Sequence, residues 1–252
     1  MAELRRLLIE SHRLLKSQDN NDALELTINE YHYLAHVLRL HVGDKFHIVD
    51  GIGNLWCATL DSGQRVKLNS SISKPDANQK KSLPRLCLAV AVPKKGFDDV
   101  LRMCCEIGID ILQPITSDRS VINAIHQSRF KRWQYILNEA VEQSERLWKP
   151  DLRSAITFSE LFIDNSRDSF VSFGVTRSKQ SKPLDHLLSE LSSQTAELWV
   201  VIGPEGGWSE KEIQQASKNR WLQISIGENI LRTSTAAISA TQIMASWRSQ
   251  LR

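Results

Sequence analysis

The pattern of hydrophobic and polar positions changes near residue 85. Before that point, short apolar stretches between polar turns predict strands around Arg6–Ile9, Lys45–Val49, Leu55–Leu60 and Val66–Leu68. The turn-rich stretch "VDGIGNLW" predicts a hairpin between two of these strands, and "NEYHYLAHVLRL" predicts a helix that interrupts them. We therefore expect residues 1–72 to form a small β-barrel with one helix.

After residue 85 the apolar runs become longer and alternate with helical segments. The run "RLCLAVAV" has the length of a strand that is buried on both faces, and further strands are expected at "GIDILQPIT", "SFVSFGVT", "AELWVVIG" and "LQISIG". Helices are expected over about Phe97–Ile107, Gln127–Trp148, Pro183–Leu191, from Ser209, and over about Thr233–Ser249. Strands that alternate with helices predict a parallel sheet covered on both faces, so the expected fold class is α/β.

A polar stretch separates the two patterns. "NSSISKPDANQKKSLP" holds two prolines and has no apolar period, which predicts a linker at residues 73–84 and a second domain at residues 85–252. No run of about 18 apolar residues occurs, so no membrane-spanning helix and no membrane partner is expected. The cysteines form no CxxC pair, which favours reduced thiols in a cytoplasmic protein. The net charge of +3 permits an anionic partner without requiring one.

The stretch "VVIGPEGGWSEKEI" joins a strand to a helix through a glycine loop. A phosphate loop would read GxxxxGK[ST] and a dinucleotide loop GxGxxG, and this loop matches neither because it carries Glu205 and no cation. Its glycines would let backbone approach a flat or sugar-bearing ligand. The pattern is equally typical of a tight turn in which Ser209 and Glu212 form a capping box.

A second glycine-bearing loop follows the next predicted strand. In "SIGENILRTSTAAISATQ" the strand ends at Ile226 and Gly227, the loop reaches Arg232, and a helix of small residues follows. Ligands of parallel sheets bind outside the carboxyl ends of the strands. The two loops are therefore expected to form two walls of one pocket.

Several stretches together carry a resemblance to a known family. They are "HYLAHVLRLHVGD", "VDGIG", "AVPKKGFDDVLRMCCEIGI", "QPITSDRS", "RFKRWQYILNEAVEQSERLWKP", "IGPEGGWSEKEI" and "IGENILRTSTAA". The chain resembles the RsmE family of ribosomal RNA uridine-N3 methyltransferases, in the SPOUT superfamily, over nearly its whole length. The resemblance implies an N-terminal PUA-like, RNA-binding β-barrel and a C-terminal SPOUT domain with a deep trefoil knot. It also implies a homodimer, S-adenosyl-L-methionine as cofactor, and 16S rRNA within the 30S ribosomal subunit as partner.

The resemblance also implies where the site lies. The cofactor would be held mainly by backbone at the ends of three strands, at Phe173, Gly174, Gly203, Gly207, Ile226, Gly227, Ile230 and Leu231. Uracil N3 must lose a proton before it can attack, and Glu205 is the candidate general base or orienting group. Arg232 could stabilise the oxyanion that forms. The alternatives are a solvated loop carboxylate and a structurally paired arginine.

One position departs from the family pattern. The family usually reads "RTETA" where this chain reads "RTSTA", so Ser234 stands in place of a glutamate. If that glutamate does chemistry in relatives, serine cannot replace it as a base. If it only caps the last helix or pairs across the dimer, serine can cap too and activity should survive. We favour the capping role.

Cations at two places are predicted to contact RNA phosphate. They are Arg5 and Arg6 near the N-terminus, and Arg129, Lys131, Arg132 and Arg146 in the helix expected from Gln127. Three of them lie at a helix start, where the dipole disfavours cations, so an RNA contact would explain them; a solvated face is the alternative. His32 and His36 have the spacing of a metal pair, but no cysteine or carboxylate has matching spacing, so we expect no metal.

Two other functions stay open at this point. A SPOUT enzyme of this fold could instead methylate a ribose 2′-hydroxyl or another base. The chain could also be a ribosome-associated RNA-binding protein that has lost catalysis, an alternative raised by Ser234.

Overall fold

The computed structural model describes residues 4–17, 23–122, 124–161, 168–191 and 195–251. The chain forms two compact units. The N-terminal unit comprises Met1–Lys81 and Asn138–Lys149, and the C-terminal unit comprises Ser82–Leu137 and Pro150–Arg252.

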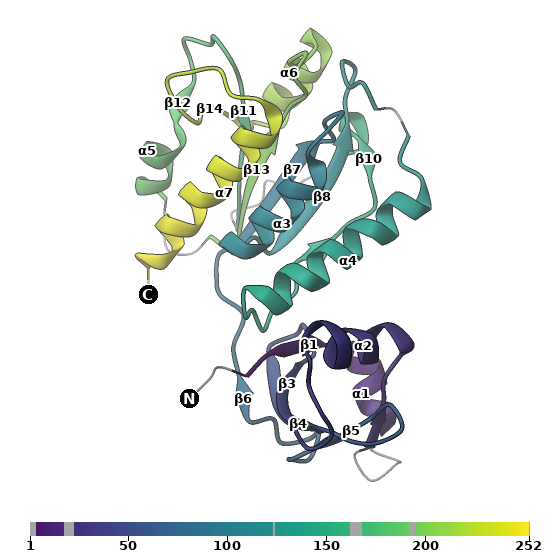
Figure 1. Cartoon of the computed structure of the whole chain (residues 1–252). Helices are drawn as coiled ribbons and strands as arrows, with labels where there is room; N and C mark the ends of the chain where they lie inside the picture. Colours follow the sequence, from purple (N-terminus) through teal and green to yellow (C-terminus); the bar gives the residue numbers. More distant parts are fainter. Residues whose placement is uncertain (1–3, 18–22, 123, 162–167, 192–194, 252) are drawn as a thin grey trace. The chain divides into compact units, whose positions relative to one another are not determined.

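The N-terminal unit is built on a six-stranded sheet that curls into a half-barrel (Figure 1). Its strands are β1 Arg6–Leu8, β2 Ala23–Glu25, β3 Lys45–Val49, β4 Asn54–Leu60, β5 Arg65–Leu68 and β6 Ala77–Asn78. The order is β1-β3-β4-β5-β2, with β6 paired to β4, and only the β1–β3 pair is parallel. The helices are α1 Ser11–Ser17, α2 Ile28–His32 and the π-helix η2 Tyr33–Val37. Phe46, Ile48 and Trp56 lie in the core inside the curl.

The segment predicted as a linker belongs to this sheet. Asn78 pairs with Asn54 and Ala77 with Leu55. The carboxylate of Asp76 accepts a hydrogen bond from the Cys57 N–H at 2.6 Å. The prediction of a free linker at residues 73–84 was therefore wrong for its first part. This segment joins the sheet through backbone pairing and polar side chains. Its sequence therefore shows no apolar period from which a strand could be predicted.

The domain boundary also differs from the prediction, which placed residues 138–149 in the second domain. These residues pack on β1: Glu145 forms an ion pair with Arg6, and the Glu142 carboxylate accepts the Leu8 N–H at 2.8 Å. The helix from Gln127 ends at Gln143 instead of Trp148, and Glu145 has a left-handed φ of 58°. A helix cannot continue through such a residue.

The C-terminal unit is built on an eight-stranded parallel sheet. Its strands are β7 Arg85–Ala91, β8 Ile111–Thr116, β9 Asp151–Leu152, β10 Ile156–Thr157, β11 Ser169–Gly174, β12 Lys182–Pro183, β13 Glu197–Ile202 and β14 Leu222–Ser225. The order is β10-β8-β7-β13-β11-β14-β12, with β9 paired to β8. The helices are α3 Phe97–Ile107, α4 Gln127–Gln143, α5 Leu184–Ser189, α6 Glu210–Lys218, α7 Thr233–Ser249 and the 3₁₀ helix η3 Phe158–Glu160. Residues of α4 from Asn138 onward belong to the N-terminal unit.

Helices cover both faces of this sheet, as predicted. In Figure 1, α3 and α7 lie across the front face, and both pack in the same layer. On the opposite face, Trp199 and Val201 pack against Phe158 of η3 and Ala216 of α6. Because both faces are covered, Leu86–Ala91 of β7 is buried throughout. The α/β fold class is confirmed, while the trefoil knot stays a prediction. No helix in the described part of the chain is long and apolar enough to cross a membrane.

Candidate active site

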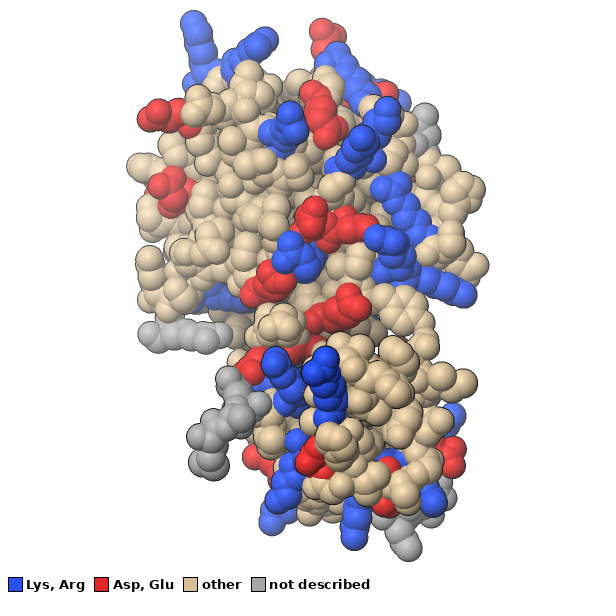
Figure 2. All heavy atoms as spheres, in the orientation of Figure 1, with Lys and Arg blue, Asp and Glu red and all other residues tan. Residues whose placement is uncertain are grey.

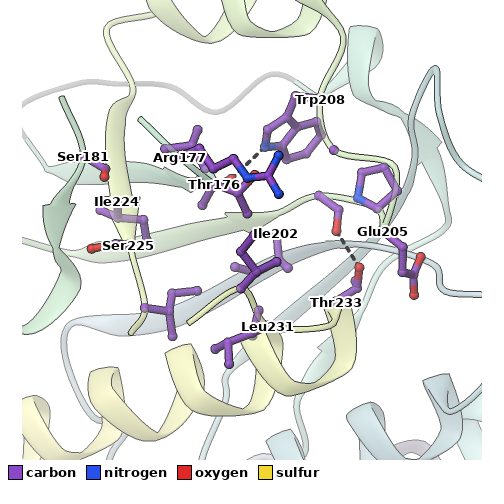
Figure 3. A pocket seen from close by; sticks show the side chains of 18 of the residues that line it. Thr176, Arg177, Ser181, Ile202, Glu205, Trp208, Ile224, Ser225, Leu231 and Thr233 are labelled. Atoms are coloured by element: carbon purple, nitrogen blue, oxygen red, sulfur yellow. Dashed lines mark hydrogen bonds between the residues drawn. The ribbon is translucent and has the colours of Figure 1, made fainter. Parts of the chain in front are cut away.

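Three neighbouring strands end at one cavity. β11 lies between β13 and β14 in the sheet, and the loops that leave their carboxyl ends line a cavity of about 590 Å³ (Figure 3). Two loops form opposite walls, which we call the glycine wall (Gly203–Trp208) and the open wall (Ile226–Leu231). This is the position at which parallel sheets bind ligands.

The glycine wall is fixed by Trp208. A Cβ added at Gly203 would lie 2.7 Å from Cε2 of the Trp208 ring, so only glycine fits there. The ring is held by its own Nε1, which donates to the Gly174 carbonyl at 2.8 Å. Thr233, at the start of α7, donates its hydroxyl to the Gly203 carbonyl, also at 2.8 Å. The glycine wall is thus joined to the end of β11 and to α7.

A buried carboxylate anchors the other end of the glycine wall. Ser209 and Glu212 form the predicted capping box at the start of α6, which is therefore confirmed. Glu212 is only 4% exposed, and its second oxygen accepts the Asp118 N–H at 3.0 Å. Ser209 in turn donates to the Asp118 carboxylate at 2.6 Å, and Arg119 donates to the Gly206 carbonyl at 3.2 Å. These bonds connect the glycine wall to the loop after β8.

The open wall has no comparable support. In the part of the chain that the structure describes, no hydrogen bond reaches Ile226–Leu231. A Cβ at Gly227 would meet no heavy atom within 4 Å, and the Ile230 residue is 61% exposed. This wall therefore presents free backbone groups and an uncovered apolar side chain to the cavity.

The structure brings together most of the predicted cofactor residues. Seven of the eight line the cavity: Gly174, Gly203, Gly207, Ile226, Gly227, Ile230 and Leu231. Phe173 does not, because its side chain is 1% exposed and points into the core under the sheet. Alternation along β11 explains this, since neighbouring residues of a strand face opposite sides.

The two predicted catalytic residues lie at different distances from the cavity. Glu205 lines its rim, is exposed, and directs its carboxylate away from the other labelled side chains in Figure 3. Arg232 is not a lining residue; it is the N-cap of α7, and its side chain is exposed. The capping role expected for Ser234 was wrong, because α7 begins at Thr233 and Ser234 already lies within the helix.

Several lining residues escaped the sequence analysis. They include Arg119, Thr176, Arg177, Trp208 and Thr233. Arg119 falls in "QPITSDRS" and Trp208 in "IGPEGGWSEKEI", two stretches that carried the family resemblance, so their presence there was a usable signal. Arg177 had no such signal.

Of the two arginines near the N-terminus that are predicted to contact RNA, one is ion-paired within the protein and the other is exposed. Arg6 forms an ion pair with Glu145 at 2.9 Å and its side chain is 15% exposed, so its charge is satisfied within the unit. Arg5 is exposed. Beside this pair, burial raises the pKa of the Glu142 carboxyl to about 7. Arg5 is therefore better placed than Arg6 to meet a phosphate.

Figure 2 shows Lys and Arg side chains gathered over the start of α4, with acidic side chains beside them. Lys131 is exposed, and Arg132 is exposed but pairs with Asp98 at 2.9 Å. Arg129 lies over the Trp133 ring at 5.4 Å. Two of these three predicted RNA contacts thus already interact with other side chains of the protein, and Lys131 is the most accessible of the three.

The remaining candidates lie in the N-terminal unit. Arg146 is half-buried. The His32 and His36 rings lie 5.0 Å apart on α2 and η2. Within the described residues, no group of three or more potential metal ligands is assembled.

Comparison with known proteins agrees with this architecture. An RNA methyltransferase domain model matches residues 79–245, and an RNA methyltransferase PUA domain model matches residues 26–67. The chain is 34% identical over 226 residues to ribosomal RNA small subunit methyltransferase E of Synechocystis sp., covering 87% of this chain and 72% of the relative. It is 30% identical over 227 residues to the protein of that name from Rickettsia conorii, covering 87% and 88%.

A solved structure has the same fold. It is ribosomal RNA small subunit methyltransferase E from Neisseria gonorrhoeae bound to S-adenosyl methionine, with a TM-score of 0.78 at 24% identity, covering 97% of this chain and 98% of the other. With the matched family model and the identity to the Synechocystis protein, the assignment is clear. The chain belongs to the ribosomal RNA small subunit methyltransferase E family, the RsmE family that its motifs resemble.

Proposed function

We propose that this chain is an S-adenosyl-L-methionine-dependent methyltransferase that methylates N3 of one uridine in the 16S rRNA of the small ribosomal subunit. The observation that carries the proposal is the cavity between the glycine wall and the open wall, at the ends of β11, β13 and β14. It coincides with the two motifs on which the family resemblance rests, "IGPEGGWSEKEI" and "IGENILRTSTAA".

The residues of the cavity fit such a cofactor. A volume of about 590 Å³ lies within the range of roughly 300–1,000 Å³ that small-molecule sites occupy. Added Cβ atoms at Gly207 and Gly227 would meet nothing within 4 Å, so backbone on both walls is accessible to a nucleoside. No lysine lines the cavity among the described residues, and of the two arginines that do, Arg119 donates to the Gly206 carbonyl, so the lining lacks the lysine that is typical of a polyphosphate loop.

The cofactor supplies, when bound, an electrophilic methyl group on a sulfonium. The chain must hold the acceptor base in line with that methyl, and positioning of this kind supplies much of the rate gain. Uracil N3 also has to lose its proton. We assign this role to Glu205, whose carboxylate stands at the rim and has to turn inward. We assign Arg232, beside the cavity, to the negative charge that forms on the uracil oxygens.

The proposal includes the partners that the resemblance implies. We propose that the chain works in the cytoplasm as a homodimer on the assembled 30S subunit, with Arg5 and Lys131 as the most accessible phosphate contacts. Sedimentation equilibrium of the purified protein tests the dimer. A single species with the mass of one chain would contradict it.

The test is methyl transfer to purified 30S subunits from a strain that lacks the corresponding gene. We expect one N3-methyluridine in the digested 16S rRNA, identified by mass spectrometry, and a block to primer extension at that nucleotide, because the N3 adduct prevents base pairing. A methyl group on ribose, or cofactor binding without transfer, contradicts the proposal. In the same assay, Glu205→Gln and Arg232→Ala should lower kcat; unchanged rates would remove the assigned roles.

A further inference from the structure

The turn after β11 places an arginine over the cavity in a strained backbone conformation. Arg177 has a φ of 60°, in the left-handed region that non-glycine residues rarely adopt. Such strain persists where the surroundings fix it, and it is frequent at ligand clamps. In Figure 3 the Arg177 side chain extends across the cavity in the direction of Trp208.

The turn is fixed from both sides. Before Arg177, the Val175 N–H donates to the Ile224 carbonyl of β14 at 3.0 Å. After it, the Ser178 hydroxyl donates to the Gln223 side chain at 2.6 Å, and the Ser181 hydroxyl donates to the Ser178 carbonyl at 2.9 Å. Arg177 is therefore presented by a preorganised turn.

The guanidinium of Arg177 is unpaired among the described residues. It makes no hydrogen bond or ion pair with any residue that the structure describes, although Glu205 and Glu228 line the same cavity. The other lining cation, Arg119, is occupied by the Gly206 carbonyl. A guanidinium keeps its charge at every accessible pH and presents a fork that matches a carboxylate. Arg177, an exposed residue that lines the cavity, is thus an unpaired cation that can receive an anion there.

We propose that Arg177 binds the α-carboxylate of the methyl donor and so selects donors that retain their amino-acid portion. This inference rests on the proposed function, in which the backbone of the two walls holds the nucleoside portion. The amino-acid end then needs a partner of opposite charge, and Arg177 is the lining cation that is free to supply it. An RNA phosphate is the competing anion, because Arg177 and Lys179 are both exposed on the same turn; only Arg177 of the two lines the cavity in which the donor is proposed to bind.

Two ligands that differ in the amino-acid portion test the proposal. S-adenosylhomocysteine carries the carboxylate, whereas 5′-methylthioadenosine has the same nucleoside and sulfur without it. In calorimetric titrations, Arg177→Gln should lower the affinity for S-adenosylhomocysteine by about tenfold or more. This loss is the equivalent of one charge-assisted hydrogen bond. Its affinity for 5′-methylthioadenosine should not change, which also shows that the variant is folded. Lys179→Gln, the control, should leave both affinities unchanged.

Other results overturn the proposal. An equal loss of affinity for both ligands would mean that Arg177 shapes the nucleoside site. Unchanged affinities together with a raised KM for 30S subunits would assign the guanidinium to an RNA phosphate. Failure of the wild-type protein to bind either ligand would instead contradict the proposed function itself, so the two failures are distinguishable.

Discussion

The two walls of the cavity differ in how they are held. The glycine wall is joined to three other parts of the C-terminal unit, through Trp208, Thr233 and the Glu212 capping box. The open wall receives no hydrogen bond from any described residue. A supported wall is preorganised for binding, whereas an unsupported one can adapt to what it binds. Substitutions in the glycine wall should therefore lower stability and donor affinity together, and substitutions in the open wall should lower donor affinity alone.

The largest expected effect is that of Glu212→Ala. The substitution removes the acceptor of two backbone N–H groups, from Ser209 and Asp118, at a side chain that is 4% exposed. Because both donors lose their partner, we expect a loss of about 3 kcal/mol in the free energy of unfolding. Urea unfolding followed by tryptophan fluorescence measures it.

Glu210→Ala is the matched control, because Glu210 lies in the same first turn of α6 and is exposed. It should cost only about 0.5 kcal/mol, through its favourable position at the helix N-terminus. Equal losses in the two variants would show that negative charge at the N-terminus of α6, and not the hydrogen bonds of the buried Glu212 carboxylate, holds the glycine wall.

Gly203→Ala comes next. The added Cβ would meet the Trp208 ring at 2.7 Å, and that ring cannot move away freely because it is bonded to Gly174 and lies against Phe158, with ring centroids 4.8 Å apart. We expect a loss of about 2 kcal/mol from overpacking, together with loss of S-adenosylhomocysteine binding. Unfolding and calorimetry on the same sample measure both. If the variant were destabilised but kept its donor affinity, stability and donor affinity would not depend on the glycine wall together.

The sequence predicted the longer helices and strands better than the short strands. The fold followed from periodicity: β3, α3 and α7 have the expected limits because each keeps one period along its length. β6, β9, β10 and β12 have two residues each, too few to display a period. They were missed for that reason.

The site was predictable in its backbone and not in its side chains. The two glycine loops predicted the walls, since a loop without lysine at a strand end already restricts the ligand. Trp208 and Thr233 act through contacts between β11, β13 and α7, which depend on a strand order that spacing along the chain does not encode. Arg177 reaches the cavity because β11, which it follows, lies between β13 and β14 in that order. Arg232 was predicted, in the site that the family resemblance implied, to stabilise the oxyanion; as the N-cap of α7 it is exposed and does not line the cavity.

Thr233→Val should have a smaller effect. Valine has the shape of threonine but cannot donate to the Gly203 carbonyl, so one partly buried hydrogen bond of 2.8 Å is lost. We expect a loss of about 1 kcal/mol in the free energy of unfolding and a moderate loss of donor affinity. Thr235→Val is the control, since Thr235 is exposed two residues later in α7. A change of the same size in the control would show that helix propensity, not the bond to Gly203, sets the effect.

The smallest stability effect is expected for Gly227→Ala, in the open wall. The added Cβ would meet no atom within 4 Å, and Gly227 does not have a left-handed backbone, so alanine fits without strain. The free energy of unfolding should change by no more than about 0.5 kcal/mol. The methyl group would nevertheless occupy space on the lining of the cavity, so the affinity for S-adenosylhomocysteine should fall measurably. Gly43→Ala, at a surface turn outside the cavity where the φ of 96° strains alanine, should lower stability and leave that affinity unchanged. If Gly227→Ala destabilised the protein as much as Gly203→Ala, the open wall would be supported by contacts equal to those of the glycine wall, and the contrast between the two would not hold.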